Sequence, residues 1–315
     1  MPLFQVFSDL NIDFMRYRRS AAILSGAALL ICLLALPIRG LNFGLDFTGG
    51  AVIELGYAQP TEIAEVTAVL AEEGFDDAVV QYFGSRQDIL VRLPPVAEDE
   101  SGATQSDQVF QALSNAAGGQ VELRRVEFVG PQVGEELREQ GGLAVLFSLI
   151  GILIYVALRF EWRFAVGAVA ALIHDVLFTV GIFSLFAIPF DLTVLAALLA
   201  VIGYSLNDTI VIFDRIRENF RRMRRGTVLE ITNRSINQTM SRTIITSGTT
   251  LAVLFALYFL GGEAISGFSL ALIIGILVGT YSTIFIATAI AVWLGISRSD
   301  LLPVPKEGAA VDERP

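Results

Sequence analysis

The sequence predicts an α-helical polytopic membrane protein with six transmembrane helices and one external α+β domain between the first and second of them. Hydrophobic residues make up 54% and charged residues 17% of the 315 residues, whereas a soluble domain carries about 25% charged residues. Six stretches are apolar over about 20 residues, the length that crosses a bilayer as a helix. Most acidic residues lie instead in one segment, 39–141. These three observations predict the fold class.

The apolar runs set the expected spans, which are residues 20–38, 142–158, 164–187, 191–213, 243–260 and 264–294. The first run follows a basic N-terminal segment, 1–19, as in a signal peptide. It is longer than the roughly 7–15 apolar residues of a cleaved signal, and no small-x-small site follows it. The first span is therefore expected to remain as an anchor, and residues 142–294 to form the bundle of the second to sixth helices.

Arginine placement predicts the orientation, because short loops rich in arginine stay in the cytoplasm. Arginines occur before the first span, in the 159–163 turn and in the segment 214–242, whereas the 188–190 and 261–263 turns have none. Both termini, the basic loop 214–242 and the tail 295–315 are then cytoplasmic, and residues 39–141 lie outside. That external segment holds 18 acidic and 6 basic side chains, so nucleic-acid binding is not expected.

The external segment has the pattern β-α-β-β-α-β, the ferredoxin-like split βαβ unit. Pro60 precedes its first helix and Gly74 follows it, as helix ends require. The expected strands are 51–55, 79–83, 89–93 and 121–129, and the expected helices are 61–73 and 105–117. The chain has one cysteine and one histidine, so it can form no intramolecular disulfide and no site that needs two histidines. No catalytic, metal or cofactor site is expected.

Two glycine-rich segments, 43–50 and 129–134, flank the external domain. Glycine permits turns with φ > 0, and it also suits a hinge that transmits events in the membrane to the domain. The sequence leaves both interpretations open. The residues concerned are Gly44, Asp46, Gly49, Gly50, Gly130, Pro131 and Gly134.

Ionisable side chains inside the spans are the candidate functional residues, because a charge in hydrocarbon is costly unless it faces protein or water. They are His174, Asp175, Asp208 and Arg242. At 1.5 Å per residue, Asp208 lies roughly 25 Å and Arg242 roughly 27 Å from the outer edge of the membrane. The two are therefore expected in one layer, where they can pair. His174 lies nearer the midplane and needs a water chain or a shift to join them.

Polar neighbours predict a wet interior around this pair. Tyr204 is one turn before Asp208 on the same helix face, Asn207 adjoins Asp208, and Thr246 and Thr249 follow Arg242. Asp208 and Arg242 are the expected proton relay, with a further pathway through His174, Asp175, Tyr204, Asn207 and Thr246. A static ion pair between two helices and a purely structural histidine are the alternatives. The pair Gly275 and Gly279 forms a G-x-x-x-G motif suited to close helix contact.

Several segments together resemble a known family. Residues 203–211, followed by 214–219, resemble the fourth-span signature of the SecF branch of the SecD/SecF family, which belongs to the bacterial Sec export accessory complex. Residues 43–50, 129–134, 174–175 and 236–243 are similar to further segments of that family, in the same order. The family is similar in architecture to one half of a resistance–nodulation–division (RND) transporter.

The resemblance implies a membrane subunit that pairs with SecD, through the fourth and sixth spans, in the bacterial inner membrane, with residues 39–141 in the periplasm. It implies that the pair uses the proton-motive force to help preproteins finish crossing the SecYEG channel after SecA's ATP-driven push. YajC and YidC are further implied partners, and no cofactor is implied. The implied proton-site carboxylate is Asp208, with Arg242 as its partner.

Two other function classes stay open. An RND-type proton-coupled subunit for small molecules or lipids is disfavoured by the small external segment. An intramembrane aspartyl enzyme would use Asp175 and Asp208, which must share a proton at close range. The depth offset of roughly 9–11 Å between these residues makes that pairing poor.

Overall fold

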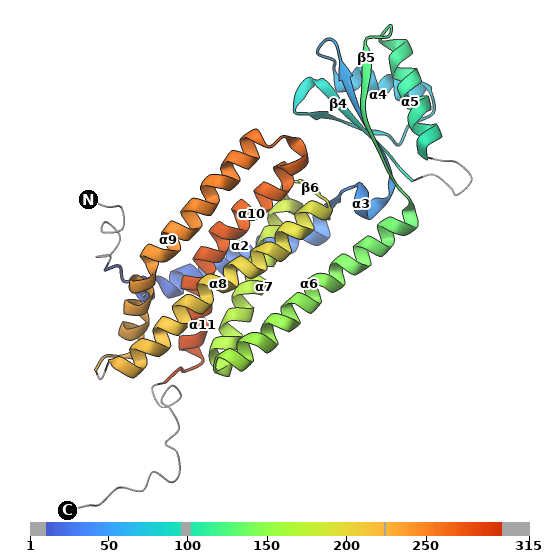
Figure 1. The fold of residues 1–315 in the computed structure, drawn as a ribbon. Coiled ribbons are helices and arrows are strands. Elements are labelled where there is room, and N and C mark those ends of the chain that lie inside the picture. The colour runs from blue at the N-terminus through green and yellow to red at the C-terminus, as the bar shows by residue number, and fades with distance from the viewer. Residues whose placement is uncertain (1–10, 96–101, 224, 298–315) are drawn as a thin grey trace, which may run out of the picture.

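The computed structural model describes residues 11–95, 102–223 and 225–297, so the outer parts of the predicted terminal segments, 1–10 and 298–315, lie outside the described residues. Within these described residues, six helices are long and apolar enough to cross a membrane, as predicted. They form one bundle with a separate α+β domain at one end (Figure 1). The first helix consists of η1 (Phe14–Tyr17) and α2 (Arg18–Arg39), the next four are α6 (Pro131–Arg159), α7 (Trp162–Leu185), α8 (Leu192–Arg222) and α9 (Val228–Leu260), and the sixth consists of α10 (Glu263–Ser282), the π-helix η2 (Thr283–Ala287) and α11 (Thr288–Trp293).

The external domain contains the predicted order of strands and helices. Its elements are β2 (Gly50–Tyr57), α4 (Ile63–Glu72), β3 (Val79–Phe83), β4 (Ser85–Leu93), α5 (Gly102–Ala116) and β5 (Val121–Val129). The four strands form an antiparallel sheet in the order β3-β4-β2-β5. Alternate residues of β2 and β4, such as Ile53 and Val91, are fully buried and pack with Leu70 of α4 and Leu113 of α5. This alternation follows from the two-residue period of a strand.

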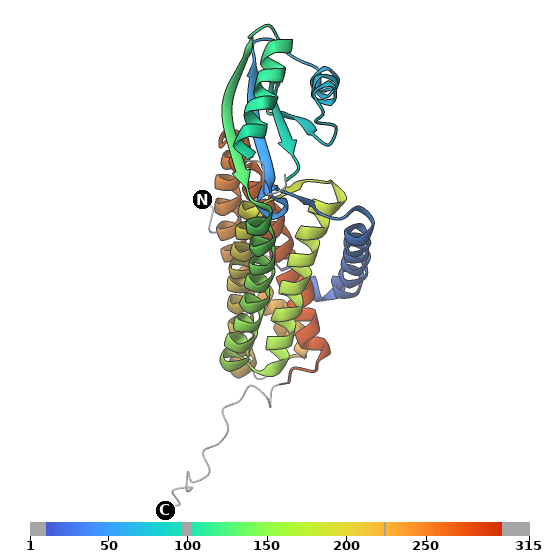
Figure 2. The ribbon, with the colours of Figure 1, turned by 90° about the vertical axis from the view of Figure 1, so that its right-hand side faces the viewer.

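The bundle is arranged around three central helices. Helices α7, α8 and α10 are about half buried within the chain, whereas α6 and α9 are mostly exposed on its outside. Figure 2 shows the domain standing above the bundle, with α2 set apart from α6 and α9. The least buried helices therefore present the surface that lipid or a partner must cover.

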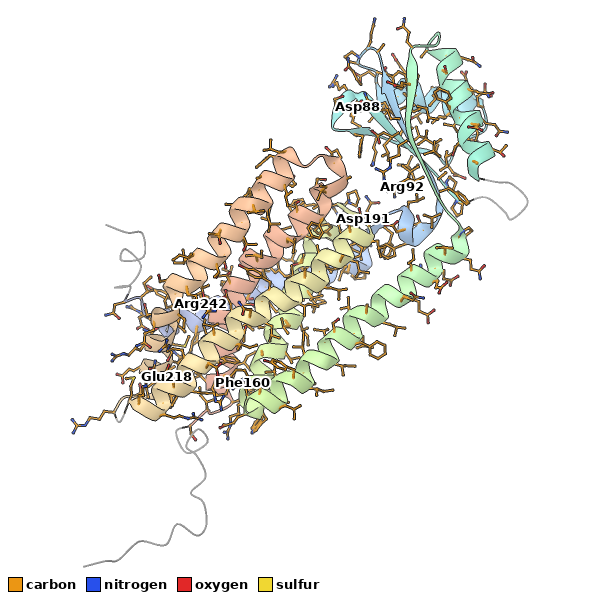
Figure 3. All side chains as sticks on the ribbon, viewed as in Figure 1. Asp88, Arg92, Phe160, Asp191, Glu218 and Arg242 are labelled. Atoms are coloured by element: carbon orange, nitrogen blue, oxygen red, sulfur yellow. The ribbon has the colours of Figure 1, made fainter. Side chains whose placement is uncertain are left out.

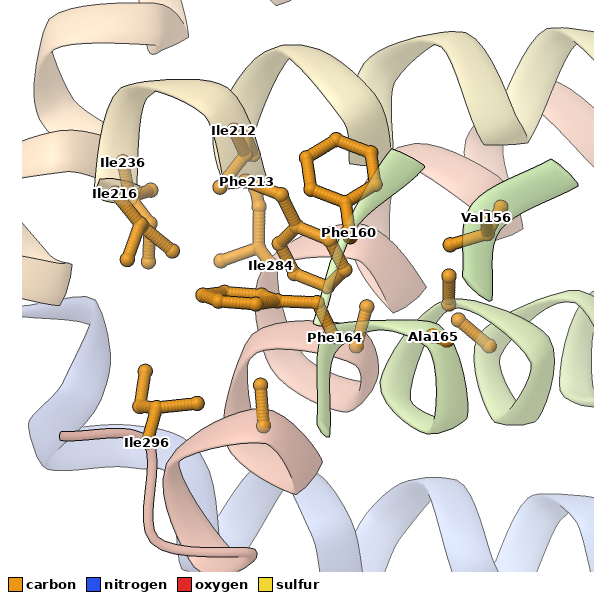
Figure 4. Packing of buried hydrophobic residues seen from close by; sticks show 14 of the residues in the cluster. Val156, Phe160, Phe164, Ala165, Ile212, Phe213, Ile216, Ile236, Ile284 and Ile296 are labelled. Atoms are coloured by element: carbon orange, nitrogen blue, oxygen red, sulfur yellow. The ribbon is translucent and has the colours of Figure 1, made fainter. Parts of the chain in front are cut away.

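An aromatic cluster stabilises the bundle at the end far from the external domain. The rings of Phe164 and Phe213 lie 4.7 Å apart, and Phe160 contacts both of them. Ile212, Ile216 and Ile284 pack around these rings (Figure 4). Close packing of this kind drives the association of helices in a bilayer, so this cluster holds α7, α8 and the η2 segment together.

The second helix is longer than predicted. Its apolar run begins at residue 142, but α6 begins at Pro131 in the first helical position, where a missing N–H costs little. Residues 131–141, which the sequence suggested as part of the external domain, are therefore helical. The charged first turns of α6 carry the helix beyond the apolar run.

The prediction that residues 214–242 form a loop is wrong, because most of them are helical. Helix α8 continues to Arg222 and α9 begins at Val228, which leaves residues 223–227 as the connection. On α8, Glu218 pairs with Arg215 at 2.8 Å and with Arg222 at 2.9 Å, spacings that support a helix. On α9, Thr227 and Glu230 form a capping box. Hydropathy marks where an apolar run ends, and these helices continue past that point.

Candidate functional site within the helical bundle

Asp208 is a buried acidic side chain on α8, with 4% of its surface exposed. Its Oδ2 atom is buried and makes no hydrogen bond. Arg242 on α9 acts on the carboxylate through its charge, and the neighbouring Thr243 is a further polar group beside it. In the part of the chain that the structure describes, no ion pair joins Asp208 to Arg242. Asp208 and Arg242 are therefore near each other, as predicted, but their side chains do not form the direct pair that the sequence suggested. A buried carboxylate oxygen without a partner is costly, so Asp208 is suited to bind a proton.

Arg242 belongs to a polar face on the outside of the bundle. It lies on α9 away from both ends of the helix (Figure 3), and its side chain is exposed. Asn207 and Thr249 are also exposed, and Thr246 is half-buried with its hydroxyl donating to the carbonyl oxygen of Arg242 at 3.0 Å. We call Asn207, Arg242, Thr246 and Thr249 the α8–α9 polar face. Because such groups are unfavourable against lipid, this face is suited to contact with protein.

Tyr204 connects the two helices of this face. Its hydroxyl donates to Oγ1 of Thr250 at 3.3 Å, which links α8 to α9 one turn from Asp208. Tyr204 therefore lies on the predicted side of the helix, but its bond goes to α9 and not to Asp208.

His174 and Asp175 form a second buried polar site. Nδ1 of His174 lies 3.1 Å from Oδ1 of Asp175, and Nε2 of His174 lies 2.6 Å from Oγ of Ser25 on α2. The hydroxyls of Ser205 on α8 and Ser282 on α10 both donate to Oδ2 of Asp175, at 2.6 and 2.8 Å. Three helices, α7, α8 and α10, therefore meet at this carboxylate, and α2 joins them through His174. His174 faces α2, and it makes no hydrogen bond to Asp208.

The sequence analysis missed the serines of this site. Ser25, Ser205 and Ser282 are buried, and each is an ordinary residue in an apolar span. The sequence feature that could have indicated them is the recurrence of serines on several spans. Serines in spans often bond to their own helix backbone, however, so this feature alone does not identify a site. Only the packed structure distinguishes the ones that face Asp175.

The G-x-x-x-G motif makes its close contact within the chain. A Cβ atom on Gly275 would lie 2.2 Å from Cγ2 of Val201, and one on Gly279 would lie 3.0 Å from Oγ of Ser205. The predicted close contact is therefore present between α10 and α8. Because the motif is used internally, it does not mark a surface of the sixth helix for a partner.

The glycine-rich segments form the junction between the external domain and the bundle. Residues 42–43 (β1) pair in parallel with residues 189–190 (β6), and the short helix α3 (Leu45–Thr48) follows. Oδ2 of Asp46 accepts a hydrogen bond from the backbone N–H of Leu192 at 2.9 Å, and Oδ1 of Asp191 accepts one from Val194 at 2.8 Å. Both carboxylates thus stabilise the N-terminus of α8.

Most glycines of the junction are explained by turns and close packing. Gly49 and Gly50 have φ of 69° and 110°, and a Cβ on Gly134 would lie 2.8 Å from the nitrogen of Gly49. A Cβ on Gly49 would lie 2.8 Å from Cα of Pro131, and one on Gly44 would lie 2.8 Å from Cβ of Asp191. Gly130 has ordinary φ and open space. The hinge interpretation stays a prediction.

Arg92 joins the sheet of the external domain to this junction. Its Nη1 donates to the carbonyl oxygen of Phe43 at 2.9 Å, and burial lowers the pKa of its guanidinium. Figure 3 places Arg92 and Asp191 on the two sides of the junction. The domain is therefore attached to the bundle by polar contacts as well as by the chain itself.

The geometry does not support the aspartyl enzyme. Asp175 bonds to His174, Ser205 and Ser282, and it shares no hydrogen bond with Asp208. Residues 11–95, 102–223 and 225–297 contain no group of three or more His, Cys, Asp or Glu side chains that could hold a metal ion. The arrangement suits proton binding at a buried carboxylate.

Comparisons with known proteins agree with these features. Residues 108–297 match the family described as "Protein export membrane protein SecD/SecF, C-terminal", and residues 34–61 match the "SecD/SecF GG Motif". The chain is 52% identical to "Protein translocase subunit SecF" of Vibrio alginolyticus, covering 99% of this chain and 100% of that protein. It is 51% identical to the protein of the same name from Pseudomonas aeruginosa, covering 97% and 98%.

A solved structure is similar over most of the chain. The crystal structure of "SecDF, a translocon-associated membrane protein" from Thermus thermophilus superposes with a TM-score of 0.80 at 38% identity. The match covers 91% of this chain and 39% of that chain, so this chain spans about two fifths of the SecDF polypeptide.

Proposed function

The chain belongs to the SecD/SecF family of protein export membrane proteins, and we propose that it uses the proton-motive force, together with SecD, to promote late steps of protein export. In this proposal the preprotein crosses through SecYEG after SecA-driven translocation. The chain is a translocase subunit and not an enzyme. The observation that carries the proposal is the buried carboxylate of Asp208, whose Oδ2 makes no hydrogen bond although Arg242 lies near it.

Proton transfer and movement are linked through the distance between these two groups. Arg242 near Asp208 favours the charged carboxylate, whereas desolvation favours the neutral one. A movement that separates α8 from α9 lets Asp208 take a proton from outside, and their approach releases it inward. Each event then biases the other by thermodynamic linkage. The sequence analysis also predicts a further pathway through His174, Asp175, Tyr204, Asn207 and Thr246, but the proposed linkage needs only Asp208 and Arg242.

SecD is the partner that covers the α8–α9 polar face. Four polar side chains there would otherwise face lipid, at a cost that protein contact removes. Exposure of Asn207 and Arg242 supports this assignment, and the sixth helix is less suited because its glycine motif packs on α8. SecYEG and the translocating preprotein are further proposed partners, as are SecA indirectly and YajC and YidC.

The proposed location is the bacterial inner membrane, with both termini in the cytoplasm. The last turns of α8 and the α6–α7 turn lie at the end of the bundle opposite the external domain (Figure 1). Both segments are rich in arginine, which supports a cytoplasmic position for that end. The external domain is then periplasmic, where the junction glycines serve as the proposed hinge. This orientation places the domain on the side where exported chains emerge.

The test is preprotein export into inverted membrane vesicles with ATP, with and without a proton gradient. Asp208→Asn keeps the shape of the side chain and removes its titration, so the gradient-dependent part of export should be lost while SecD association persists. Asp214→Asn is the matched control, because Asp214 lies on the same helix but pairs with Arg159 at the end of the bundle. A response of Asp208→Asn to the gradient equal to that of the wild type would refute the mechanism.

A further inference from the structure

We propose that Asp175 is a positioning residue for Asp208. Its carboxylate holds, through the hydroxyls of Ser205 and Ser282, the turn of α8 on which Asp208 lies. This inference rests on the proposed function, in which Asp208 takes up the proton. It assigns to Asp175 the role of a fixed anchor in place of a step in the proton path.

The first contact is between α7 and α8. Oγ of Ser205 donates to Oδ2 of Asp175 at 2.6 Å, and both side chains are almost fully buried. Ser205 is three residues before Asp208 and therefore on the adjacent turn of the same helix. A buried hydrogen bond that is broken leaves its donor and acceptor without water to replace it, so this contact fixes the position of that turn.

The second contact reaches the other side of Asp208. Thr209 and Thr283 share a hydrogen bond of 2.9 Å between their hydroxyls. Thr283 is the first residue of the π-helix η2, and Ser282 immediately before it donates to the same Oδ2 of Asp175 at 2.8 Å. The residues on both sides of Asp208 are therefore tied to Asp175, one directly and one through η2.

The close approach of α10 leaves little room for this turn to move. A Cβ on Gly279 would lie 3.0 Å from Oγ of Ser205 and 3.4 Å from Oδ2 of Asp175. Helix α10 therefore packs directly against the hydrogen bond between Ser205 and Asp175. π-Bulges are frequent at functional sites, and here η2 begins next to the serine that contacts Asp175.

The charged and titratable groups around the site lie on three sides. Arg242 on α9 acts on Asp208. His174 on α7 bonds to Asp175, and the ring of Tyr281 on α10 lies 6.5 Å from the ring of His174. His174 in turn bonds to Ser25 on α2, so this chain of contacts leads away from Asp208. A network that ends on α2 is suited to anchoring and not to delivering protons to α8.

The test measures the protonation of Asp208 directly in membranes that contain the full chain with SecD. Dicyclohexylcarbodiimide labels protonated carboxyl groups in apolar surroundings, and mass spectrometry of the α8 peptide quantifies the label on Asp208 as a function of pH. Ser205→Ala and Ser282→Ala should each move the midpoint of labelling by about half a pH unit or more, because each loses one hydrogen bond that fixes the turn. In an Asp175→Ala background, Ser205→Ala should add no further shift.

Ser269→Ala is the matched control. Ser269 is a fully buried serine of α10 whose hydroxyl has no hydrogen-bond partner, so its loss should leave the midpoint unchanged. Ser282→Ala could fail to accumulate in the membrane while Ser269→Ala accumulates normally. In that case Ser282→Thr, which keeps the hydroxyl, should restore both accumulation and the wild-type midpoint. Failure to restore them contradicts the anchoring role of Asp175.

The possible failures are distinguishable. Wild-type labelling of Asp208 with a midpoint that neither serine variant moves overturns the role of Asp175 and leaves the proposed function intact. Absence of pH-dependent labelling of Asp208 in the wild type overturns the proposed function, and the role of Asp175 with it.

Discussion

Replacement of Asp46 by alanine should loosen the start of α8 without unfolding the chain. Asp46 lies in the junction, outside α8, yet its Oδ2 accepts the N–H of Leu192 at 2.9 Å. Loss of a helix-capping acceptor costs about 0.5–2 kcal/mol. Because Asp46 is half-buried, we expect a value near the middle of this range, about 1 kcal/mol. A loss of about 1 kcal/mol increases the population of the locally open state about fivefold.

Hydrogen exchange measures this change directly. Deuterium uptake at Leu192, followed in a peptide that covers the start of α8, should become about fivefold faster in Asp46→Ala when reclosing is faster than exchange. Val194 should keep its protection, because its N–H bonds to Asp191 at 2.8 Å. Asp46→Asn keeps an acceptor and loses the charge, so its effect should be smaller.

An exposed acid of the external domain provides the control for this prediction. Asp77→Ala removes the same charge from a residue that is exposed on the external domain, and it should leave uptake at Leu192 unchanged. Uptake in Asp46→Ala within about 1.5-fold of the wild type would refute the reasoning, because it would mean that Asp46 contributes almost nothing to the capped state.

Two further predictions concern packing and titration. Gly275→Ala places a methyl group 2.2 Å from Cγ2 of Val201, so it should destabilise the chain by about 1–3 kcal/mol and lower its Tm in detergent. Gly203→Ala on α8, where nothing lies within 4 Å of the added Cβ, should leave Tm unchanged or raise it. Burial raises the pKa of Tyr57 from 10.0 to about 12, so the unfolded chain releases this proton first and stability falls as pH rises from about 10 to about 12. Tyr57→Phe should remove that loss and also the most alkaline step in the ultraviolet titration of the tyrosines; an unchanged titration would contradict the assignment.

Rare charges in apolar spans made part of the site predictable from the sequence. Asp208 and Arg242 stand out because ionisable residues inside a membrane are costly, and helical rise alone placed them at one depth. Their missing ion pair could not be predicted, because it depends on the rotation of α8 and α9 about their axes. The same rotation leaves Arg242 on the surface and Asp208 inside.

The periodicity of the external domain predicted its elements for a similar reason. Ala51, Ile53 and Leu55 alternate toward one face, and such a local pattern needs no knowledge of the partner strands. The ends of α6, α8 and α9 were predicted less well, because charged turns that lie beyond the apolar run carry no hydropathy signal. The capping box of Thr227 and Glu230 is the local feature that would have located the start of α9.

Helix α8 unites the features that sequence reasoning treated separately. Its first turn is capped by Asp46 from the junction, its middle packs on Gly275 through Val201, and its Ser205 bonds to Asp175. Asp208 lies 16 residues beyond Leu192, roughly 24 Å along the same helix. Closely packed helix interfaces shift between discrete arrangements and do not deform continuously. A displacement of the start of α8 at the junction therefore reaches Asp208 only if the contact of Ser205 with Asp175 also changes. The Asp46 and Ser205 variants therefore test the start and the middle of one helix, and they should couple in a double-mutant cycle if α8 moves as a unit.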